Sequence, residues 1–162
     1  MRIAVISDIH GNLAALEAVL ADVKARGADL AVNLGDCCTS PLWPRETLEL
    51  LDTLRLPTVR GNHDRSMIDW PRERMNRAGA YTYDSLSAAQ RAALGALPAT
   101  VRLDGGILAV HGTPWSDTTY LLEDKHEGRL VMATRGAIGE RLAGFDARIV
   151  LGGHSHHANV AY

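Results

Sequence analysis

Short apolar runs alternate with amphipathic stretches through the first 60 residues of the chain. Residues 2–6 (RIAVI) and 30–34 (LAVNL) are apolar and rich in β-branched side chains, which predicts two buried strands. Between residues 13 and 23, leucines and a valine recur every three or four positions, the period of a helix with one buried face. Pro44 suits the first turn of a second helix, and residues 56–59 predict a third strand. This alternation predicts βαβ units and a largely parallel sheet.

The second half of the chain has a less regular pattern. Residues 65–98 read as polar and helical, with a break at 78–81 (AGAY). Two short apolar runs flank Asp-Gly-Gly within residues 100–110, which predicts a β-hairpin. Residues 123–142 predict a helix, and residues 147–151 a last strand. Because no linker or repeat interrupts the pattern, we expect one α/β domain.

Composition narrows the class of protein. The chain has 162 residues, enough for one domain with a substantial core, and its formal net charge is -2. That charge gives no sign of a surface that wraps nucleic acid or binds an acidic membrane. A small anionic substrate stays compatible with it, because a bound cation reverses the local field.

The two cysteines, Cys37 and Cys38, are adjacent in the sequence. Adjacent cysteines suit neither a disulfide framework nor a CxxC metal site, and free thiols are typical of a reducing compartment. The apolar run at the N-terminus is too short for a signal peptide or a membrane span. We therefore expect a cytoplasmic protein, and the role of the two cysteines stays open.

Five of the predicted strands are followed by Asp, Asn or His side chains. The carboxyl ends of strands in open α/β sheets converge on one crevice, so we expect these side chains to meet there. Glycines precede several of them and allow close approach of the backbone. The seven candidates are Asp8, His10, Asp36, Asn62, His111, His154 and His156.

Carboxylate, amide and imidazole side chains together are the ligand set of first-row divalent metals such as manganese, iron, zinc or nickel. Magnesium fits less well because it prefers oxygen ligands and keeps several waters. Seven candidates exceed what one ion needs, and one carboxylate can bridge two ions about 3.5–4 Å apart. The sequence therefore predicts a site for two divalent ions, with manganese the first choice.

The same residues form five motifs in a fixed order along the chain. They are Asp8-Ile9-His10, Gly35-Asp36, Gly61-Asn62-His63-Asp64, His111-Gly112 and Gly153-His154-Ser155-His156. In this order the sequence resembles the calcineurin-like metallophosphoesterase family, in its small bacterial and archaeal branch. The resemblance covers nearly all of residues 1–162.

The resemblance implies a fold, and it also implies that one sheet of that fold is incomplete. The expected fold is a layered α/β/β/α sandwich of two mixed sheets flanked by helices, in a single metallophosphoesterase domain. Family members run on through further strands after the last motif, whereas this chain stops at Tyr162. We therefore expect a second sheet that is incomplete at the C-terminus. Its unpaired edge would favour a homo-oligomer.

The resemblance also implies a role for each motif residue. One ion would be held by Asp8, His10, Asp36 and His156, and a second by the bridging Asp36 with Asn62, His111 and His154. A hydroxide that bridges the ions would attack phosphorus in line. His63 would act as general acid, with Asp64 orienting its imidazole; the alternative for Asp64 is a cap on the following helix.

The function expected from these features is hydrolysis of a small phosphate ester, and the favoured hypothesis is a phosphodiesterase. A phosphomonoesterase or nucleotide phosphatase is the alternative within enzymes, and a non-catalytic metal- or nucleotide-binding domain is the alternative outside them. Asn12 and Arg60 lie beside the motifs in the sequence, so both are candidates for contacts with the phosphate. The expected substrate is a phosphate ester of low molecular weight, with a nucleotide among the candidates.

Overall fold

The structure is a computed structural model that describes residues 1–162, and its elements follow the α/β class expected from the sequence. The strands are β1 (Ile3–Ile6), β2 (Leu30–Asn33), β3 (Thr100–Leu103), β4 (Ile107–Val110), β5 (Glu123–His126), β6 (Arg129–Met132) and β7 (Ile149–Leu151). The α-helices are α1 (Leu13–Ala25), α2 (Pro44–Leu54), α3 (Asn62–Asp69), α4 (Arg77–Ser85), α5 (Ala88–Gly95) and α6 (Arg135–Arg141). A short 3-10 helix, η1, spans Arg72–Arg74.

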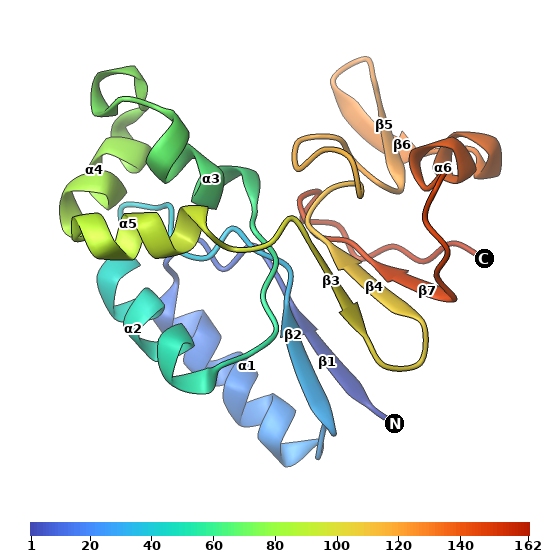
Figure 1. Cartoon of the computed structure of the whole chain (residues 1–162), viewed down its shortest axis with the longest axis horizontal. Coiled ribbons are helices and arrows are strands. Elements are labelled where there is room, and N and C mark those ends of the chain that lie inside the picture. Colours follow the sequence, from blue (N-terminus) through green and yellow to red (C-terminus); the bar gives the residue numbers. More distant parts are fainter.

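Two small sheets form the centre of the molecule (Figure 1). In the first, β1 pairs in parallel with β2. In the second, β4 pairs antiparallel with β3 and parallel with β7, so that β7 lies at an edge. Helices α1 and α2 lie on one side of the first sheet, and α3, α4 and α5 form a separate helical group beyond its carboxyl end (Figure 1). The mixed α/β fold class is thereby confirmed.

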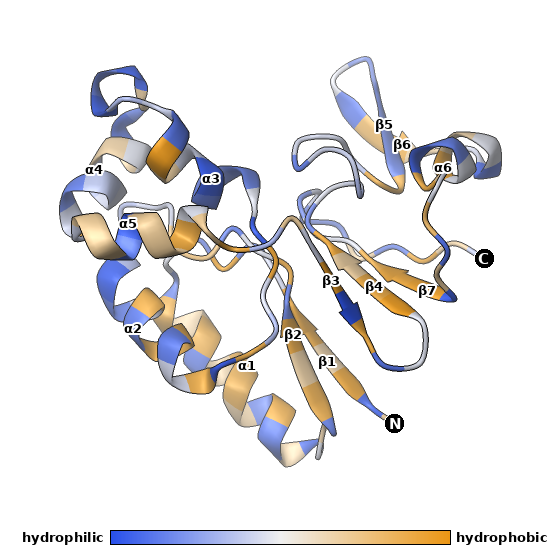
Figure 2. Ribbon diagram, viewed as in Figure 1, coloured by the Kyte–Doolittle hydropathy of each residue, from blue (hydrophilic) through white to orange (hydrophobic).

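A hydrophobic core lies between the two sheets. Val32 of β2 and Ala109 of β4 are fully buried and pack with Val59, and side chains of β1, β3 and β7 surround them. Hydrophobic colour is accordingly concentrated on β1, β2, β4 and β7 (Figure 2). Burial of this apolar surface fixes the two sheets against each other and so fixes where their strands end.

A second hydrophobic cluster joins the helical group to the loop after β2. It contains Cys37 and Cys38, packed with Leu48, Met67 and Leu94. Both thiols are free and buried, and burial raises the pKa of each well above its usual value. The two cysteines therefore serve as small apolar side chains, and their thiols stay protonated.

The stretch 123–142 is not the single helix that its sequence pattern predicts. Strands β5 and β6 form a hairpin there, and α6 follows as a separate helix. The two turn residues, Glu127 and Gly128, have φ angles of 48° and 80°, the left-handed conformation of a type I′ turn. Glycine adopts this conformation easily but glutamate rarely does, so the pair gave no clear turn signal.

Two smaller predictions also need correction. The expected break at residues 78–81 lies inside α4, and the real interruption falls between Trp70 and Asn76, where Pro71 follows the end of α3. The third strand of the first sheet reduces to one bridge between Asn33 and Thr58, because Pro57 has no N–H to donate. The predicted hairpin within residues 100–110 is confirmed. None of the helices combines the length and the hydrophobicity needed to cross a membrane.

Candidate metal centre

Six of the candidate ligands follow β1, β2, β4 and β7, and Asn62 begins α3; most of them share an unusual backbone conformation. Five have positive φ angles: Asp8 at 52°, His10 at 46°, Asp36 at 55°, His154 at 69° and His156 at 57°. This left-handed conformation costs about 1–2 kcal/mol for a residue with a side chain. It persists only where the surrounding structure holds it in place, and such strain concentrates at functional sites.

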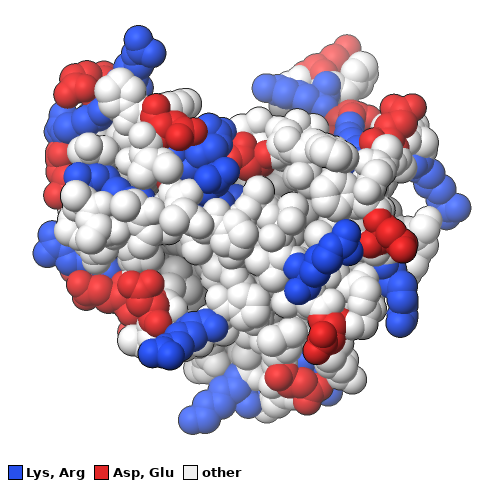
Figure 3. Space-filling view, in the orientation of Figure 1, with Lys and Arg blue, Asp and Glu red and all other residues white.

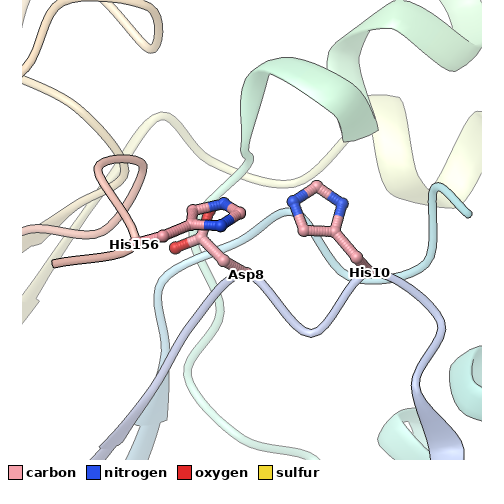
Figure 4. Close-up of side chains that lie close together, drawn as sticks. All are labelled: Asp8, His10 and His156. Carbon is pink, nitrogen blue, oxygen red and sulfur yellow. The ribbon is translucent and has the colours of Figure 1, made fainter. Parts of the chain in front are cut away.

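The first group of ligand atoms belongs to Asp8, His10 and His156, which converge in Figure 4. Their ligand atoms all lie within 4.8 Å of one another. Asp8 Oδ1 is buried and accepts no hydrogen bond, although His156 Nε2 lies 3.3 Å away. A buried carboxylate oxygen without a donor is costly, and a cation in this group would satisfy it.

The second group belongs to Asp36, His111 and His154, with Asn62 beside it. Asn62 Oδ1 lies 3.1 Å from His111 Nε2. Asp36 stands between the two groups, because its Oδ2 is 3.4 Å from His111 Nε2 and 3.7 Å from His10 Nε2. Asp36 is therefore within reach of both groups, and the structure brings all seven predicted ligands to one place.

Backbone carbonyls fix which ring nitrogen three of the histidines present to the site. A carbonyl oxygen only accepts hydrogen bonds, so the ring nitrogen facing it carries the hydrogen. The contacts are His10 Nδ1 with Thr39 O at 3.1 Å, His111 Nδ1 with Leu34 O at 2.7 Å and His154 Nε2 with Thr118 O at 3.2 Å. In each case the other nitrogen faces away from that carbonyl and is the one that a metal can bind once it carries no hydrogen, the arrangement that proteins use to orient metal-binding histidines.

Two glycines allow these loops to approach closely. A Cβ on Gly61 would lie 2.0 Å from Asp36 Oδ1, and a Cβ on Gly153 would lie 2.1 Å from Ser7 Oγ. Neither distance is possible for a real side chain. Glycine is therefore required at both positions to place Asp36 and Asp8 as observed.

Asp64 does not have the contacts of a residue that orients His63. Its buried carboxylate accepts hydrogen bonds from three backbone N–H groups, those of Asp36 at 2.9 Å, Cys37 at 3.0 Å and Gly61 at 2.9 Å. Burial and the Asp36 charge raise the pKa of Asp64 to about 6, although these hydrogen bonds oppose the shift. The capping alternative describes the contacts: Asp64 ties the loop after β2 to the start of α3.

His63 lies beside the first group, with its ring 5.1 Å from the ring of His10 at an interplanar angle of 84°. Its backbone N–H donates to Asp36 Oδ1 at 2.9 Å. Burial lowers the pKa of His63 below its usual value; Asp36 opposes this shift, and His10 adds to it. Burial therefore has a larger effect on the pKa of His63 than the Asp36 carboxylate has.

The two candidate phosphate contacts are placed differently. Asn12 caps α1, where its Oδ1 accepts from Ala15 N at 3.1 Å. Arg60 lines a cavity next to His111 and donates one hydrogen bond to Gly95 O at 2.8 Å, while its buried Nε has no partner. Arg60 is thus the better placed of the two.

Sequence reasoning missed two residues that hold the last motif in place. Tyr120 stacks on the His154 ring with centroids 4.8 Å apart. Buried Glu123 accepts hydrogen bonds at Oε1 from Ser155 Oγ at 3.1 Å and Asn159 Nδ2 at 2.7 Å. Neither residue stands next to a motif, and Glu123 lies in a stretch whose pattern predicted a helix.

Comparisons with known proteins decide the family. A family model described as calcineurin-like phosphoesterase matches residues 1–158. The chain belongs to this family. A metallophosphoesterase from Sphaerobacter thermophilus is 34% identical, with a TM-score of 0.73 over 96% of this chain and 61% of its own. The resemblance to the calcineurin-like metallophosphoesterase family, noted from the five sequence motifs, is thereby confirmed.

Two more proteins resemble this calcineurin-like phosphoesterase chain. An uncharacterised protein of Methanocaldococcus jannaschii is 52% identical over 62 residues, which are 38% of this chain and 26% of that protein. A putative diadenosine tetraphosphatase has the same fold, with a TM-score of 0.64 and 21% identity over 95% of this chain and 75% of its own. The chain therefore spans about a quarter of the archaeal protein and about three fifths of the Sphaerobacter protein.

Metal binding by this calcineurin-like phosphoesterase should release a proton from His111. Burial alone would lower the pKa of His111, but contact with Asp36 and its charge raise that pKa to about 9. His111 is then protonated at pH 7.5 without metal, and its stabilising contact with Asp36 is lost only as the pH rises through 9. An ion at Nε2 must displace this proton, so metal affinity should rise with pH by up to about tenfold per unit between pH 6.5 and 9.

Titration calorimetry with Mn²⁺ at pH 7.5 in two buffers of different ionisation enthalpy measures the released proton. The control is His126→Ala on β5, which should release the same number of protons as the wild type. Heats that do not depend on the buffer would show that His111 carries no displaceable proton.

Replacement of Glu123 should weaken metal binding without touching a ligand. Glu123→Ala removes the acceptor of Ser155 and Asn159, which frees the loop that carries His154 and His156. We expect about tenfold weaker Mn²⁺ binding, the scale of effects for residues that support ligands. Glu123→Gln keeps an acceptor oxygen and should bind nearly as the wild type does, as should Glu140→Ala on α6. Unchanged affinity in Glu123→Ala would contradict the role given to this carboxylate.

Proposed function

We propose that this chain hydrolyses phosphate esters with two divalent metal ions, as a phosphodiesterase. The observation that carries the proposal is the joint arrangement of two ligand groups around Asp36, with the imidazoles oriented by backbone carbonyls. An arrangement of this kind serves metal binding and has no evident use in stabilising the fold, because it places strained residues around buried carboxylates.

The residues present fit two ions. Asp8 Oδ1 is buried without a hydrogen bond, and Asp36 lies within reach of both groups. Mixed carboxylate, amide and imidazole donors favour manganese, with iron, zinc and nickel as alternatives. One ion would bind Asp8, His10, Asp36 and His156, and the other Asp36, Asn62, His111 and His154. Bound there, the two ions would lower the pKa of a water molecule and neutralise charge on the phosphoryl oxygens.

The chain's own residues supply positioning and a proton. Burial would raise the pKa of Asp36, but His111 outweighs it and holds that pKa below its usual value, so Asp36 stays ionised at neutral pH. His63 lies beside His10 and is the group placed to protonate the leaving oxygen. Cys37 and Cys38 are buried with raised pKa values, so neither acts as a nucleophile.

A nucleotide is the substrate class that we favour among phosphate esters. Two observations support this choice: the fold is shared with a putative diadenosine tetraphosphatase, and an arginine, Arg60, borders the site. A phosphomonoesterase is the rival within the same chemistry. A non-catalytic domain that binds metal or nucleotide is the rival outside it.

Hydrolysis of bis-p-nitrophenyl phosphate tests the proposal. The metal-stripped protein is assayed before and after Mn²⁺ is added back, and p-nitrophenyl phosphate runs in parallel. We expect Mn²⁺-dependent turnover, with the diester faster than the monoester. A faster monoester would favour the phosphomonoesterase. No turnover of either ester by protein that has bound two ions would contradict the enzyme and leave the binding domain.

His63→Ala should retain both metal ions and lose turnover in a pH-dependent way. A general acid contributes about 10²–10⁴-fold, and more for poor leaving groups than for p-nitrophenolate. Because the pKa of His63 is lowered, its protonated fraction falls as the pH rises above that pKa. The ratio of wild-type to variant rate should therefore be largest below pH 6.5 and shrink as the pH rises.

Steady-state rates on an alkyl and a p-nitrophenyl diester, measured from pH 5.5 to 8.5 with metal content checked, give this ratio. The matched control is His157→Ala, an exposed histidine next to the last motif. A ratio near one at every pH for the alkyl diester would remove the general-acid role.

A further inference from the structure

Two of the cavities that border the metal centre also contain a tryptophan. The larger has a volume of about 350 Å³ and is lined by Arg60, His111 and Trp115 among others. The smaller has a volume of about 150 Å³ and is lined by His63, Trp70 and Met75 among others. Each cavity thus brings residues of the centre together with one tryptophan.

Arg65 lines both cavities. Its guanidinium forms a two-pronged ion pair with Asp117, at 2.6 Å from Nε and 3.0 Å from Nη2, and a further contact with Asp69 at 3.0 Å. Two parallel hydrogen bonds hold both partners in one orientation. Figure 3 shows this face hollowed between the helical group and the β5–β6 hairpin, with basic and acidic side chains side by side in the hollow.

Both tryptophans are largely exposed to solvent. Trp115 is 68% exposed, although its indole N–H donates to Ala143 O at 3.2 Å and its ring packs edge-on against Phe145. Trp70 ends α3 and is 52% exposed. Exposed indoles of this size are costly to leave in water and offer flat faces on which a planar ring can stack.

We propose that the two cavities receive the two organic groups of a phosphodiester, each with a planar ring. The leaving group enters the smaller cavity and stacks on Trp70, and the retained group enters the larger cavity and stacks on Trp115. This inference rests on the proposed phosphodiesterase function and names the substrate class of that site: a diester with aromatic or nucleoside groups on both sides of phosphorus.

His63 and His111 decide which cavity receives the leaving group and which receives the retained group. A general acid must lie within hydrogen-bond reach of the leaving oxygen, and His63 lines only the smaller cavity. His111 borders the larger cavity but donates its Nδ1 hydrogen to Leu34 O and turns Nε2 toward Asp36, so it has no proton for a leaving group once metal is bound.

In the reaction, a water oxygen bonds to phosphorus and the bond from phosphorus to the leaving oxygen breaks. His63 gives its proton to that oxygen, and the attacking water releases a proton to solvent. The products are an alcohol from the smaller cavity and a phosphomonoester held in the larger one. Arg60, whose buried Nε has no partner, adds positive charge beside the retained group.

Two substrates with the same leaving group separate the two cavities. Bis-p-nitrophenyl phosphate and methyl p-nitrophenyl phosphate both release p-nitrophenol and differ only in the retained group. The measured quantity is the ratio of their kcat/KM values. Trp115→Ala should lower this ratio about tenfold, the scale of one lost aromatic stack. Trp70→Ala should lower both rates and keep the wild-type ratio, and Trp43→Ala, outside both cavities, should change neither.

Binding of phenylphosphonate, a mimic of the retained product that is not hydrolysed, gives a second readout. Calorimetry on the Mn²⁺-loaded protein should show its affinity, relative to that of methylphosphonate, reduced about tenfold in Trp115→Ala and unchanged in Trp70→Ala.

An unchanged ratio in Trp115→Ala, or a lowered ratio in Trp70→Ala instead, would overturn the assignment while leaving the phosphodiesterase function intact. Failure of the wild type to hydrolyse either diester with metal bound would overturn both proposals, so the two failures are distinguishable.

Discussion

The carboxylate of Asp64 is the contact on which the arrangement of the centre depends. It is fully buried and accepts three backbone N–H groups, from Asp36, Cys37 and Gly61. These bonds join the loop after β2 to the start of α3 and set the Asp36 carboxylate between the two ligand groups. A buried carboxylate without such donors would be strongly unfavourable, and with them it stays compatible with a folded core. One side chain thereby positions both Asp36 and the helix that carries Asn62 and His63.

The rest of the centre is held in a similar way, by fixed hydrogen bonds to backbone. Carbonyl oxygens of Leu34, Thr39 and Thr118 orient three imidazoles, and the left-handed backbone of five ligands turns their side chains inward. Without a cation, Asp8 keeps a buried oxygen that accepts no hydrogen bond, and His111 carries a proton beside Asp36. Two bound cations would relieve both features, because they satisfy the carboxylates and displace the proton. This strained, charged geometry fits a site for divalent metal ions.

Much of the centre could be predicted from the sequence, because buried strands are visible as apolar runs. Each of these runs is followed by an Asp, Asn or His side chain that can bind a metal. The roles that were missed depend on contacts between distant segments. Asp64 was assigned to its sequence neighbour His63, whereas its partners include the backbone of Asp36, 28 residues away. The β5–β6 hairpin was not predicted because its turn contains Glu127, a residue that rarely adopts the left-handed conformation. The hydrogen bond from Ser155 to Glu123 of β5 was missed for the same reason. The cytoplasmic location and the homo-oligomer stay predictions.

Crystals of the protein grown with Mn²⁺ and measured at a wavelength where manganese scatters anomalously test the central claim most directly. The account predicts two anomalous peaks, one among Asp8, His10 and His156 and one among Asp36, His111 and His154, about 3.5–4 Å apart. The Asp36 carboxylate should contact both. A single peak, or two peaks that do not share Asp36, would contradict a two-metal centre built around this residue.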